Sequence, residues 1–217
     1  MTLTLYGHPF SSFTEKVLTA LYEAEAPFAF RIFGRDDPEA AAEWEKLSPT
    51  KRFPVLVDGG RTLIETSIII EHLALTWPGA APLVPADPAA ALEVRLWDRV
   101  FDTYVMNPML SLAYNEARPD DAKDAFGARQ LRGQLSSAYA WLDGVAAAGR
   151  PWAAGDSFSL ADCAAAPALL FAHWAHPIPE ALKHLHAYRR RLQERPSFAR
   201  VIEAARPYRA AFPFPTD

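Results

Sequence analysis

A proline-rich stretch after residue 77 is the feature that most limits how this chain can fold. Within positions 78–88 the sequence carries prolines at 78, 82, 85 and 88. Proline fixes its own φ and has no N–H to donate, so it is disfavoured inside helices and sheets. We therefore expect a linker at residues 78–88. It would separate a domain of residues 1–77 from a domain of residues 89–217, and both are long enough to be domains.

The two predicted domains differ in their hydrophobic patterns. Before the linker, short β-prone runs alternate with helical stripes in the order βαβ-αββα. The strands are expected at 2–6, 28–33, 54–57 and 62–64, and the helices at 11–24, 38–47 and 66–77. After the linker no convincing strand is found, and helices are expected at 89–117, 120–148, 159–175, 179–194 and 196–205. The sequence therefore predicts an α/β domain followed by an all-α domain.

Composition narrows the classes of partner and compartment. The chain carries 22 Lys and Arg against 26 Asp and Glu, and this slightly acidic balance argues against nucleic acid or a membrane as the main partner. Cys163 is the one cysteine of the sequence, which excludes an intramolecular disulfide and a cysteine-based zinc site. The sequence lacks an apolar run of about 20 residues, and its start does not resemble a signal peptide. We therefore expect a cytoplasmic protein that uses no metal.

The junction between the first predicted strand and the first predicted helix can stabilise an anion. Ser11 or Ser12 lies at the N-cap of that helix, where free N–H groups carry a partial positive charge. A thiolate placed there is stabilised, and a serine hydroxyl adds a hydrogen bond to it. The alternative is that these serines only cap the helix.

A second junction offers complementary groups. Pro54 stands at the entry of a strand, and Glu65 and Thr66 start the next helix. A carboxylate there can pair with an ammonium group, and free N–H groups can hold a carboxylate, although a simple helix cap is the alternative. Lys51 and Arg52 could hold a second carboxylate. A ligand with a thiol, an amino-acid head and a second carboxylate is glutathione.

Three short motifs resemble the cytosolic glutathione transferase superfamily. Phe53-Pro54-Val55-Leu56 is similar to the family's cis-proline loop, and Glu65-Thr66 is similar to its Glu-Ser pair that grips the γ-glutamyl head. Ser159-Leu160-Ala161-Asp162 is similar to a structural N-cap box of its helical domain. The resemblance covers essentially the whole chain. It implies a thioredoxin-like domain followed by an all-helical domain, and a cis Phe53–Pro54 bond where the residues alone favour trans.

The start of the chain is similar to serine-type enzymes of this family, with features of the phi, tau and zeta classes. No cysteine lies near residue 11, so the thiol-transferring chemistry of omega-like enzymes is not expected. We rank Ser11 above Ser12 and Tyr6 as the group that activates the thiol. The resemblance implies a transferase that adds the glutathione thiolate to an apolar electrophile. A non-catalytic binding or scaffold protein and a glutathione-dependent isomerase remain alternatives.

The resemblance, together with the positions of the aromatic residues, predicts the rest of the site. Besides Ser11, the glutathione site is expected to comprise Phe13, Lys51, Arg52, Phe53, Pro54, Glu65 and Thr66. The electrophile pocket is expected to comprise Phe10, Tyr104, Phe212 and Phe214. This pocket requires that the C-terminal tail folds over the cleft rather than packing on the outside of the helical domain. We further expect a two-fold homodimer, in which Asp98 or Asp102 could reach the glutathione of the partner.

Overall fold

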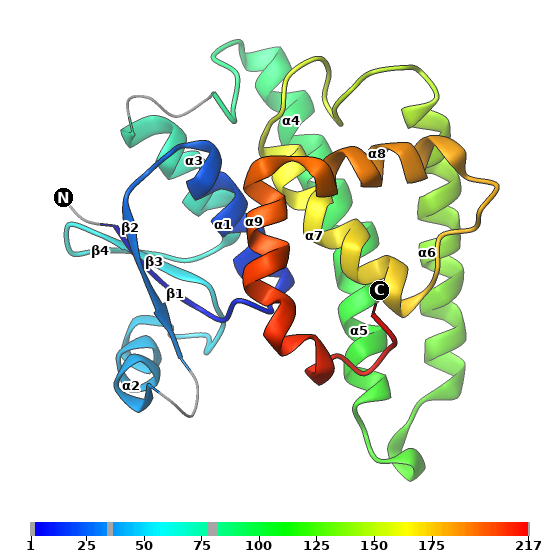
Figure 1. The fold of residues 1–217 in the computed structure, drawn as a ribbon, viewed down its shortest axis with the longest axis horizontal. Coiled ribbons are helices and arrows are strands. Elements are labelled where there is room, and N and C mark those ends of the chain that lie inside the picture. Colours follow the sequence, from blue (N-terminus) through cyan, green and yellow to red (C-terminus); the bar gives the residue numbers. More distant parts are fainter. Residues whose placement is uncertain (1–2, 34–36, 78–81, 217) are drawn as a thin grey trace.

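The computed structural model describes residues 3–33, 37–77 and 82–216, which form an α/β domain beside a helical domain (Figure 1). The elements of the α/β domain are β1 Leu3–Gly7, α1 Ser12–Glu23, β2 Phe28–Ile32, α2 Pro38–Leu47, β3 Val55–Asp58, β4 Arg61–Leu63 and α3 Thr66–Thr76. This is the predicted βαβ-αββα order, with small shifts at the ends of the elements. The predicted fold of this half is therefore confirmed.

The topology of the sheet brings the two candidate junctions together. The strand order is β2-β1-β3-β4, in which β1 is parallel to β2 and antiparallel to β3, and β3 is antiparallel to β4. Because β1 and β4 therefore run in the same direction, their carboxyl ends and the start of β3 meet at one edge of the sheet. The β1–α1 junction, the loop before β3 and the β4–α3 junction share that edge.

The helical domain follows the predicted linker, and its first helix begins at Pro88. Its elements are α4 Pro88–Val100, a π-helical segment Phe101–Met106, α5 Asn107–Glu116, α6 Ala125–Ala146, α7 Leu160–Ala175, α8 Lys183–Glu194, α9 Pro196–Ala205, and 3₁₀ turns at Asp120–Ala122 and Arg206–Ala211. The described residues after the linker contain no strand, as predicted. Helix α6 begins later than predicted because the side chain of Asp124 caps it, accepting the Gly127 N–H at 2.9 Å.

The helix predicted at 89–117 is interrupted by the π-helical segment. At the end of this segment the N–H of Asn107 bonds to the carbonyl of Asp102, five residues earlier. The next residue, Pro108, has no N–H and in a regular α-helix its ring would clash with the carbonyl four residues before it. The wider π turn accommodates the proline, and it changes which residues of α5 face the α/β domain.

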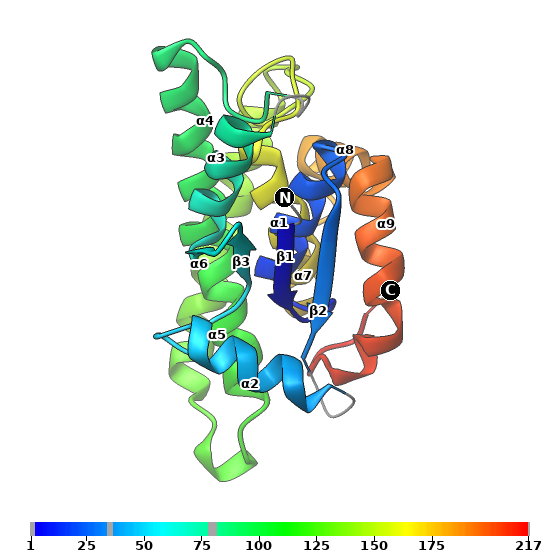
Figure 2. The same cartoon turned by 90° about the vertical axis from the view of Figure 1, so that its left-hand side faces the viewer.

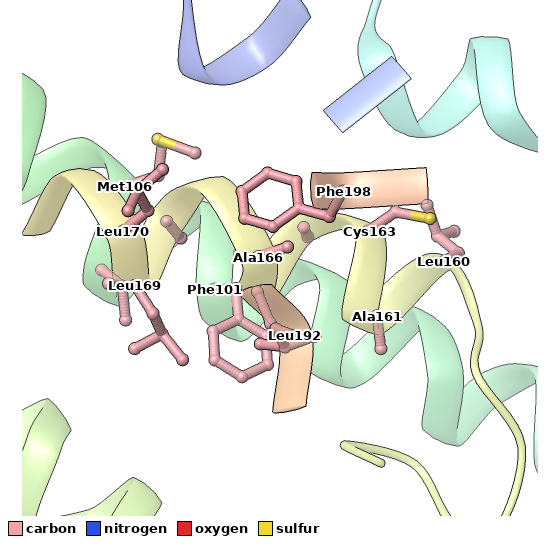
Figure 3. Close-up of a cluster of buried hydrophobic side chains, with 14 of the residues drawn as sticks. Phe101, Met106, Leu160, Ala161, Cys163, Ala166, Leu169, Leu170, Leu192 and Phe198 are labelled. Atoms are coloured by element: carbon pink, nitrogen blue, oxygen red, sulfur yellow. The ribbon is translucent and has the colours of Figure 1, made fainter. Parts of the chain in front are cut away.

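Helix α7 is the centre of the helical domain. It is buried along almost its whole length, because α1, α4, α5 and α8 pack around it. Figure 3 shows Leu160, Cys163 and Leu169 of α7 among side chains from neighbouring helices, including Phe101, Leu192 and Phe198. Cys163 is 0% exposed and burial raises the pKa of its thiol, which agrees with the predicted inert, buried cysteine.

The start of α7 carries the predicted N-cap box. Asp162 accepts the backbone N–H of Ser159 at 2.9 Å, and the Ser159 side chain completes the capping box at this helix end. Tyr188 from α8 donates its hydroxyl to Asp162 at 2.6 Å, and the N–H of Ala153 also donates to this carboxylate at 2.9 Å. Asp162 therefore ties α7 to α8 and to the preceding loop, which is a structural role.

Helix α1 joins the two domains. Figure 2, in which the sheet faces the viewer, shows α1 behind β1, and α1 packs on its other side against α7 and α9. At its far end Glu23 accepts two hydrogen bonds of 2.6 Å from the guanidinium of Arg195, which lies just before α9. The hydroxyl of Ser197 donates to the same carboxylate. The C-terminal end of α1, opposite to Ser11, is thus held against the helical domain.

Candidate functional site

A cavity of about 720 Å³ lies where the shared edge of the sheet meets the helical domain. The α/β domain lines it with Phe10, Ser11, Ser12, Phe13, Lys51, Arg52, Phe53, Pro54, Glu65 and Thr66, among others. The helical domain contributes α5, Phe171 of α7 and the C-terminal segment with Phe212. The structure therefore brings most of the sequence-predicted site residues to one cavity. Tyr104 and Phe214 are not among the residues that line it.

Ser11 is the N-cap of α1, where it faces the cavity. Its Oγ accepts the N–H of Thr14 over a long 3.4 Å, and its carbonyl accepts the N–H of Glu15 at 2.8 Å. Its own hydroxyl proton has no acceptor among the described residues, so Ser11 can still donate to a ligand while it caps the helix. Ser12 is the first residue of α1 and is only 4% exposed, although it also lines the cavity.

Tyr6 is engaged elsewhere. Its hydroxyl donates to Glu43 on α2 at 2.8 Å, and Tyr6 does not line the cavity. Burial, followed by the hydrogen bond to Glu43, raises the pKa of this hydroxyl. The alternative in which Tyr6 activates a thiol therefore loses its geometric basis.

The Phe53–Pro54 bond is cis, as the family resemblance implies. A residue that the sequence reasoning missed holds the loop before it. Ser48 is 0% exposed, accepts the Arg52 N–H at 2.9 Å and donates to the Arg52 carbonyl at 2.7 Å. The side chain of Lys51 is exposed and its ammonium donates to the carbonyl of Glu45 at 3.1 Å. The side chains of Lys51 and Arg52 are both exposed and line the cavity, where an anion can reach them.

Glu65 does not act as a side-chain cap of α3. It occupies the N-cap position with φ 67° and ψ 114°, and its carboxylate makes no capping hydrogen bond. A non-glycine residue with positive φ costs about 1–3 kcal/mol and persists where the surroundings impose it. The exposed Glu65 carboxylate is therefore available to a ligand beside the N-terminus of α3, where Thr66 is the first helical residue.

A buried ion cluster supports this end of the cavity. Lys16 of α1 is 0% exposed, and its Nζ lies 2.6 Å from Asp98 and 2.8 Å from Asp102. The hydroxyl of Ser67 on α3 accepts from Lys16 at 3.0 Å and donates to Asp98 at 2.7 Å. Burial raises the pKa of Asp102, and the charge of Lys16 acts in the opposite direction.

The ion cluster changes the expectation for the two aspartates. Asp98 and Asp102 are 2% and 5% exposed and pair with Lys16 of their own chain, so they are not free to reach the glutathione of a partner subunit. Asp102 does line the cavity, beside Arg99. The sequence contains one sign of this buried ion cluster, because the charged Lys16 interrupts the apolar stripe of α1.

The other end of the cavity has an aromatic wall. Phe10 lies with its ring centre 5.0 Å from that of Phe171 and 6.0 Å from that of Phe212. Phe214 packs behind Phe212 at 5.7 Å, so it supports the wall without lining the cavity. The C-terminal segment turns back toward α5 and α7 (Figure 1). The sequence left two arrangements open, a tail folded over the cleft and a tail packed on the outside of the helical domain. The structure has the first of them.

Tyr104 lies on a different surface. It is 55% exposed and lines a separate hollow with Gln134 and Trp141 of α6. Tyr104 comes two residues after Asp102, which lines the cavity, so it lies on the opposite side of the helix. The described residues contain no group of three or more metal-binding side chains, and no helix among them is long and apolar enough to cross a membrane.

Comparison with protein families agrees with this geometry. Residues 1–75 match the glutathione S-transferase N-terminal domain, and residues 116–191 match the glutathione S-transferase C-terminal domain. A glutathione S-transferase from Pseudomonas putida is 30% identical over 163 residues, which are 74% of this chain and 70% of that protein. The chain belongs to the glutathione S-transferase family.

Other relatives match over shorter lengths. Glutathione S-transferase U8 from Arabidopsis thaliana is 28% identical over 127 residues, 57% of this chain and 55% of that protein, so this match spans about half of each. A probable maleylacetoacetate isomerase from Vibrio cholerae is 33% identical over 126 residues, 54% of this chain and 57% of that protein. One solved structure is a glutathione S-transferase from Methylobacillus flagellatus with glutathione bound, which is 22% identical to this chain. It superposes with a TM-score of 0.82 over 92% of this chain and 98% of that chain, which shows that the two share a fold.

Proposed function

We propose that this protein is a glutathione transferase that joins the glutathione thiolate to an electrophile. The observation that carries the proposal is the single cavity that Ser11, the cis-proline loop and the Glu65–Thr66 junction share with an aromatic wall of the helical domain. Side chains and N–H groups that can bind a thiolate, an amino-acid head and a second carboxylate thus lie beside a surface that can bind an apolar second substrate.

The arrangement of charges suggests how glutathione lies in the cavity. The γ-glutamyl ammonium pairs with Glu65, and its carboxylate meets the free N–H groups at the start of α3. The glycyl carboxylate reaches Lys51 or Arg52, and the cysteinyl backbone lies along the Phe53–Pro54 loop. This orientation places the sulfur near Ser11.

The hydroxyl of Ser11 and the N-terminus of α1 then favour the ionised sulfur. A thiol with a pKa of about 8.5 is only about 3% ionised at pH 7, and a fall of about two units makes it about 75% thiolate, at about 2.7 kcal/mol. One charge-assisted hydrogen bond and a helix N-terminus together supply this magnitude. The thiol proton leaves to solvent, the sulfur forms a bond to the electrophilic carbon, and a leaving group departs with its electron pair.

Binding and turnover need separate tests. Calorimetric titration of glutathione tests binding, and a conjugation assay with an aryl halide then separates an enzyme from a non-catalytic binding protein. Glu65→Ala should weaken glutathione binding by about 1.5–3 kcal/mol because a charge-assisted hydrogen bond is lost. The exposed Glu180 lies outside the cavity, so Glu180→Ala is the matched control. Equal dissociation constants for wild type and Glu65→Ala would contradict the proposed orientation.

A glutathione-dependent isomerase is the second candidate. Both Ser11 and Ser12 line the cavity, and the relative from Vibrio cholerae is named a probable maleylacetoacetate isomerase. The two reactions differ in their use of glutathione, because an isomerase regenerates it whereas a transferase consumes it. Incubation with maleylacetoacetate and a limiting amount of glutathione distinguishes them: several turnovers per glutathione would favour the isomerase.

Exposed apolar side chains on α3, α4 and α6 support the proposed homodimer. Leu75 on α3, Leu92 on α4 and Trp141 on α6 are 85%, 67% and 49% exposed. Exposed apolar side chains of this number and size are typical of a surface that a partner covers. Light scattering at micromolar concentration tests this, and a mass of 24.0 kDa, that of one chain, would contradict it. The cytoplasmic location stays a prediction.

A further inference from the structure

A second cavity, of about 480 Å³, lies at the C-terminal end of α1, away from Ser11. Its volume is within the range of about 300–1,000 Å³ that is usual for small-molecule sites. None of its lining residues belongs to the cavity that contains Ser11. We call it the α1–α9 cavity, and it is lined by Leu21, Tyr22, Glu25, Ala26, Pro27, Phe28, Phe30 and, from α9, Arg200.

Three aromatic side chains give the α1–α9 cavity an apolar lining. Phe28 and Phe30 are two residues apart in β2, so they point to the same face of that strand. The ring centre of Tyr22 lies 5.7 Å from that of Phe28. All three side chains are only partly buried against the core, so part of each ring remains accessible in the cavity. A flat aromatic ligand can pack on these rings.

Arg200 brings to the cavity a cation whose hydrogen-bonding groups are free. Its guanidinium carbon lies 4.1 Å from the ring centre of Tyr22. Stacking uses the face of the guanidinium and leaves the N–H groups at its edge available to a planar anion. No carboxylate of the described residues pairs with this exposed arginine. The ring of Tyr22 therefore holds Arg200 in an orientation that suits a carboxylate.

Glu25 brings an unpaired carboxylate to the same cavity. It follows Ala24, the C-cap of α1, and has φ 49°, while its N–H donates to the carbonyl of Tyr22 at 3.2 Å. Glycine is preferred at this position, and a negative charge is unfavourable beside a helix C-terminus. The Glu25 carboxylate has no partner within the part of the chain that the structure describes. An ammonium group placed here would be stabilised by both the carboxylate and the helix end.

The two charges of the cavity differ from the ion pair beside them. Glu23 and Arg195, from the same two regions of the chain, are joined by two hydrogen bonds of 2.6 Å. Glu25 and Arg200 line the cavity but do not pair with each other. A purely anionic ligand would be repelled by Glu25 and a purely cationic one by Arg200, so a ligand that carries both charges is the most complementary.

We propose that the α1–α9 cavity binds a free aromatic α-amino acid. The carboxylate of the ligand pairs with Arg200, its ammonium group with Glu25, and its ring packs against the three aromatic side chains. The ligand contacts α1 of one domain and α9 of the other, so its binding stabilises the folded protein. The inference goes beyond the proposed function and does not depend on it, because Ser11 lies at the other end of α1.

Calorimetry and thermal unfolding with L-phenylalanine, L-tyrosine and L-tryptophan test the site. At least one of the three should bind and raise the melting temperature, and a lack of binding by all three would overturn the inference. An amino-acid head can also occupy the Glu65–Thr66 junction of the first cavity. The affinity should therefore be the same in Glu65→Ala as in wild type, and a loss in Glu65→Ala but not in Arg200→Gln would place the ligand in the first cavity.

Removal of each charge tests the two ends of the ligand. Arg200→Gln and Glu25→Gln should each weaken binding of the amino acid by about 10- to 100-fold, as the loss of one charge-assisted hydrogen bond predicts. Phenylpropionate lacks the ammonium group of phenylalanine and phenylethylamine lacks its carboxylate, so both should bind wild type more weakly than phenylalanine. Arg190→Gln and Glu180→Gln are the matched controls, because both residues are exposed and lie outside the cavity.

Glu25→Gly separates binding from folding. Glycine adopts φ 49° without steric cost, so this variant should be at least as stable as wild type in denaturant unfolding. It should nevertheless bind the amino acid about 10- to 100-fold more weakly, because the carboxylate is absent. Wild-type affinity in Glu25→Gly and in Arg200→Gln would overturn the proposed site.

Discussion

Lys16 and Asp98 form a fully buried ion pair between the two domains, with 2.6 Å between Nζ and Oδ1 and exposed fractions of 0% and 2%. Asp102 and Ser67 complete the cluster, so α1, α3 and α4 are held around one ammonium group. Removing a charge from water costs several kcal/mol unless its partners are well placed. The pair therefore joins the helical domain to α1 and to the start of α3, beside the cavity that Asp102 lines.

Lys16→Met should be strongly destabilising. It leaves two buried carboxylates without their cation, and breaking a buried pair in this way costs about 3–5 kcal/mol. Denaturant unfolding of wild type and variant measures the difference. Lys46 is exposed, so Lys46→Met is the control and should change the free energy of unfolding by no more than about 0.5 kcal/mol. Adding Asp98→Asn to Lys16→Met should recover part of the loss, and no recovery would argue against the electrostatic explanation.

Ser11→Ala should lower the rate of conjugation by about 10- to 100-fold, because one hydrogen bond to an ionised sulfur is lost. The affinity for glutathione should change little, since the hydroxyl acts mainly on the thiolate. Titration of the bound thiol by its ultraviolet absorbance should show a raised pKa. Tyr6→Phe serves as the control, because Tyr6 bonds to Glu43 away from the cavity. An unchanged rate in Ser11→Ala would transfer the role to Ser12 or to the backbone N–H groups.

Much of this site could be predicted because its chemistry is local. Ser11, Pro54 and Glu65 each lie where a strand meets a helix or a loop meets a strand, and a short stretch of sequence identifies such junctions. Their meeting at one edge follows from the direction of β1 and β4, which the order of elements already constrains. Most of the predicted helices and strands are correct for the same reason, since periodicity and proline positions are local signals, whereas the helices predicted at 89–117, 120–148 and 179–194 are interrupted or begin later.

The residues that were missed depend on packing. Nothing near Lys16 in the sequence shows that Asp98 and Asp102 will surround it, because those residues come from the other domain. The aromatic stripe from Trp97 to Val105 does not reveal which side of its helix meets the α/β domain. The side with Arg99 and Asp102 lines the cavity, and Tyr104 lies on the opposite side.

Deleting residues 212–217 should raise the Michaelis constant for the electrophile and leave that for glutathione nearly unchanged. Phe212 contributes to the aromatic wall through Phe10 and Phe171, whereas the glutathione contacts come from the α/β domain. Steady-state kinetics with each substrate varied in turn measures both constants. Phe212→Ala should have a larger effect than Phe214→Ala, because Phe214 does not line the cavity. Equal effects of the deletion on both constants would show that the tail does not act on the second substrate alone.

Glu15 should make the stability of the protein depend on pH. This residue of α1 is only 1% exposed, and its Oε2 has no hydrogen-bond partner among the described residues. Burial raises the pKa of its carboxyl well above the ordinary value of 4.5, and the charge of Arg209 acts in the opposite direction. Because the folded pKa is the higher one, the contribution of Glu15 to stability is fully present below pH 4.5 and is lost as the pH rises toward the folded pKa.

Glu15→Gln removes this titration, because the amide stays neutral at every pH. The free energy of unfolding of the variant minus that of wild type should therefore increase as the pH rises above 4.5, by up to about 1.4 kcal/mol per pH unit until the folded pKa is reached. Denaturant unfolding at a series of pH values measures the difference, with Glu180→Gln as an exposed control that should stay close to wild type. Profiles for Glu15→Gln and wild type that run parallel across this range would show that Glu15 is ionised in the folded protein, held by Arg209.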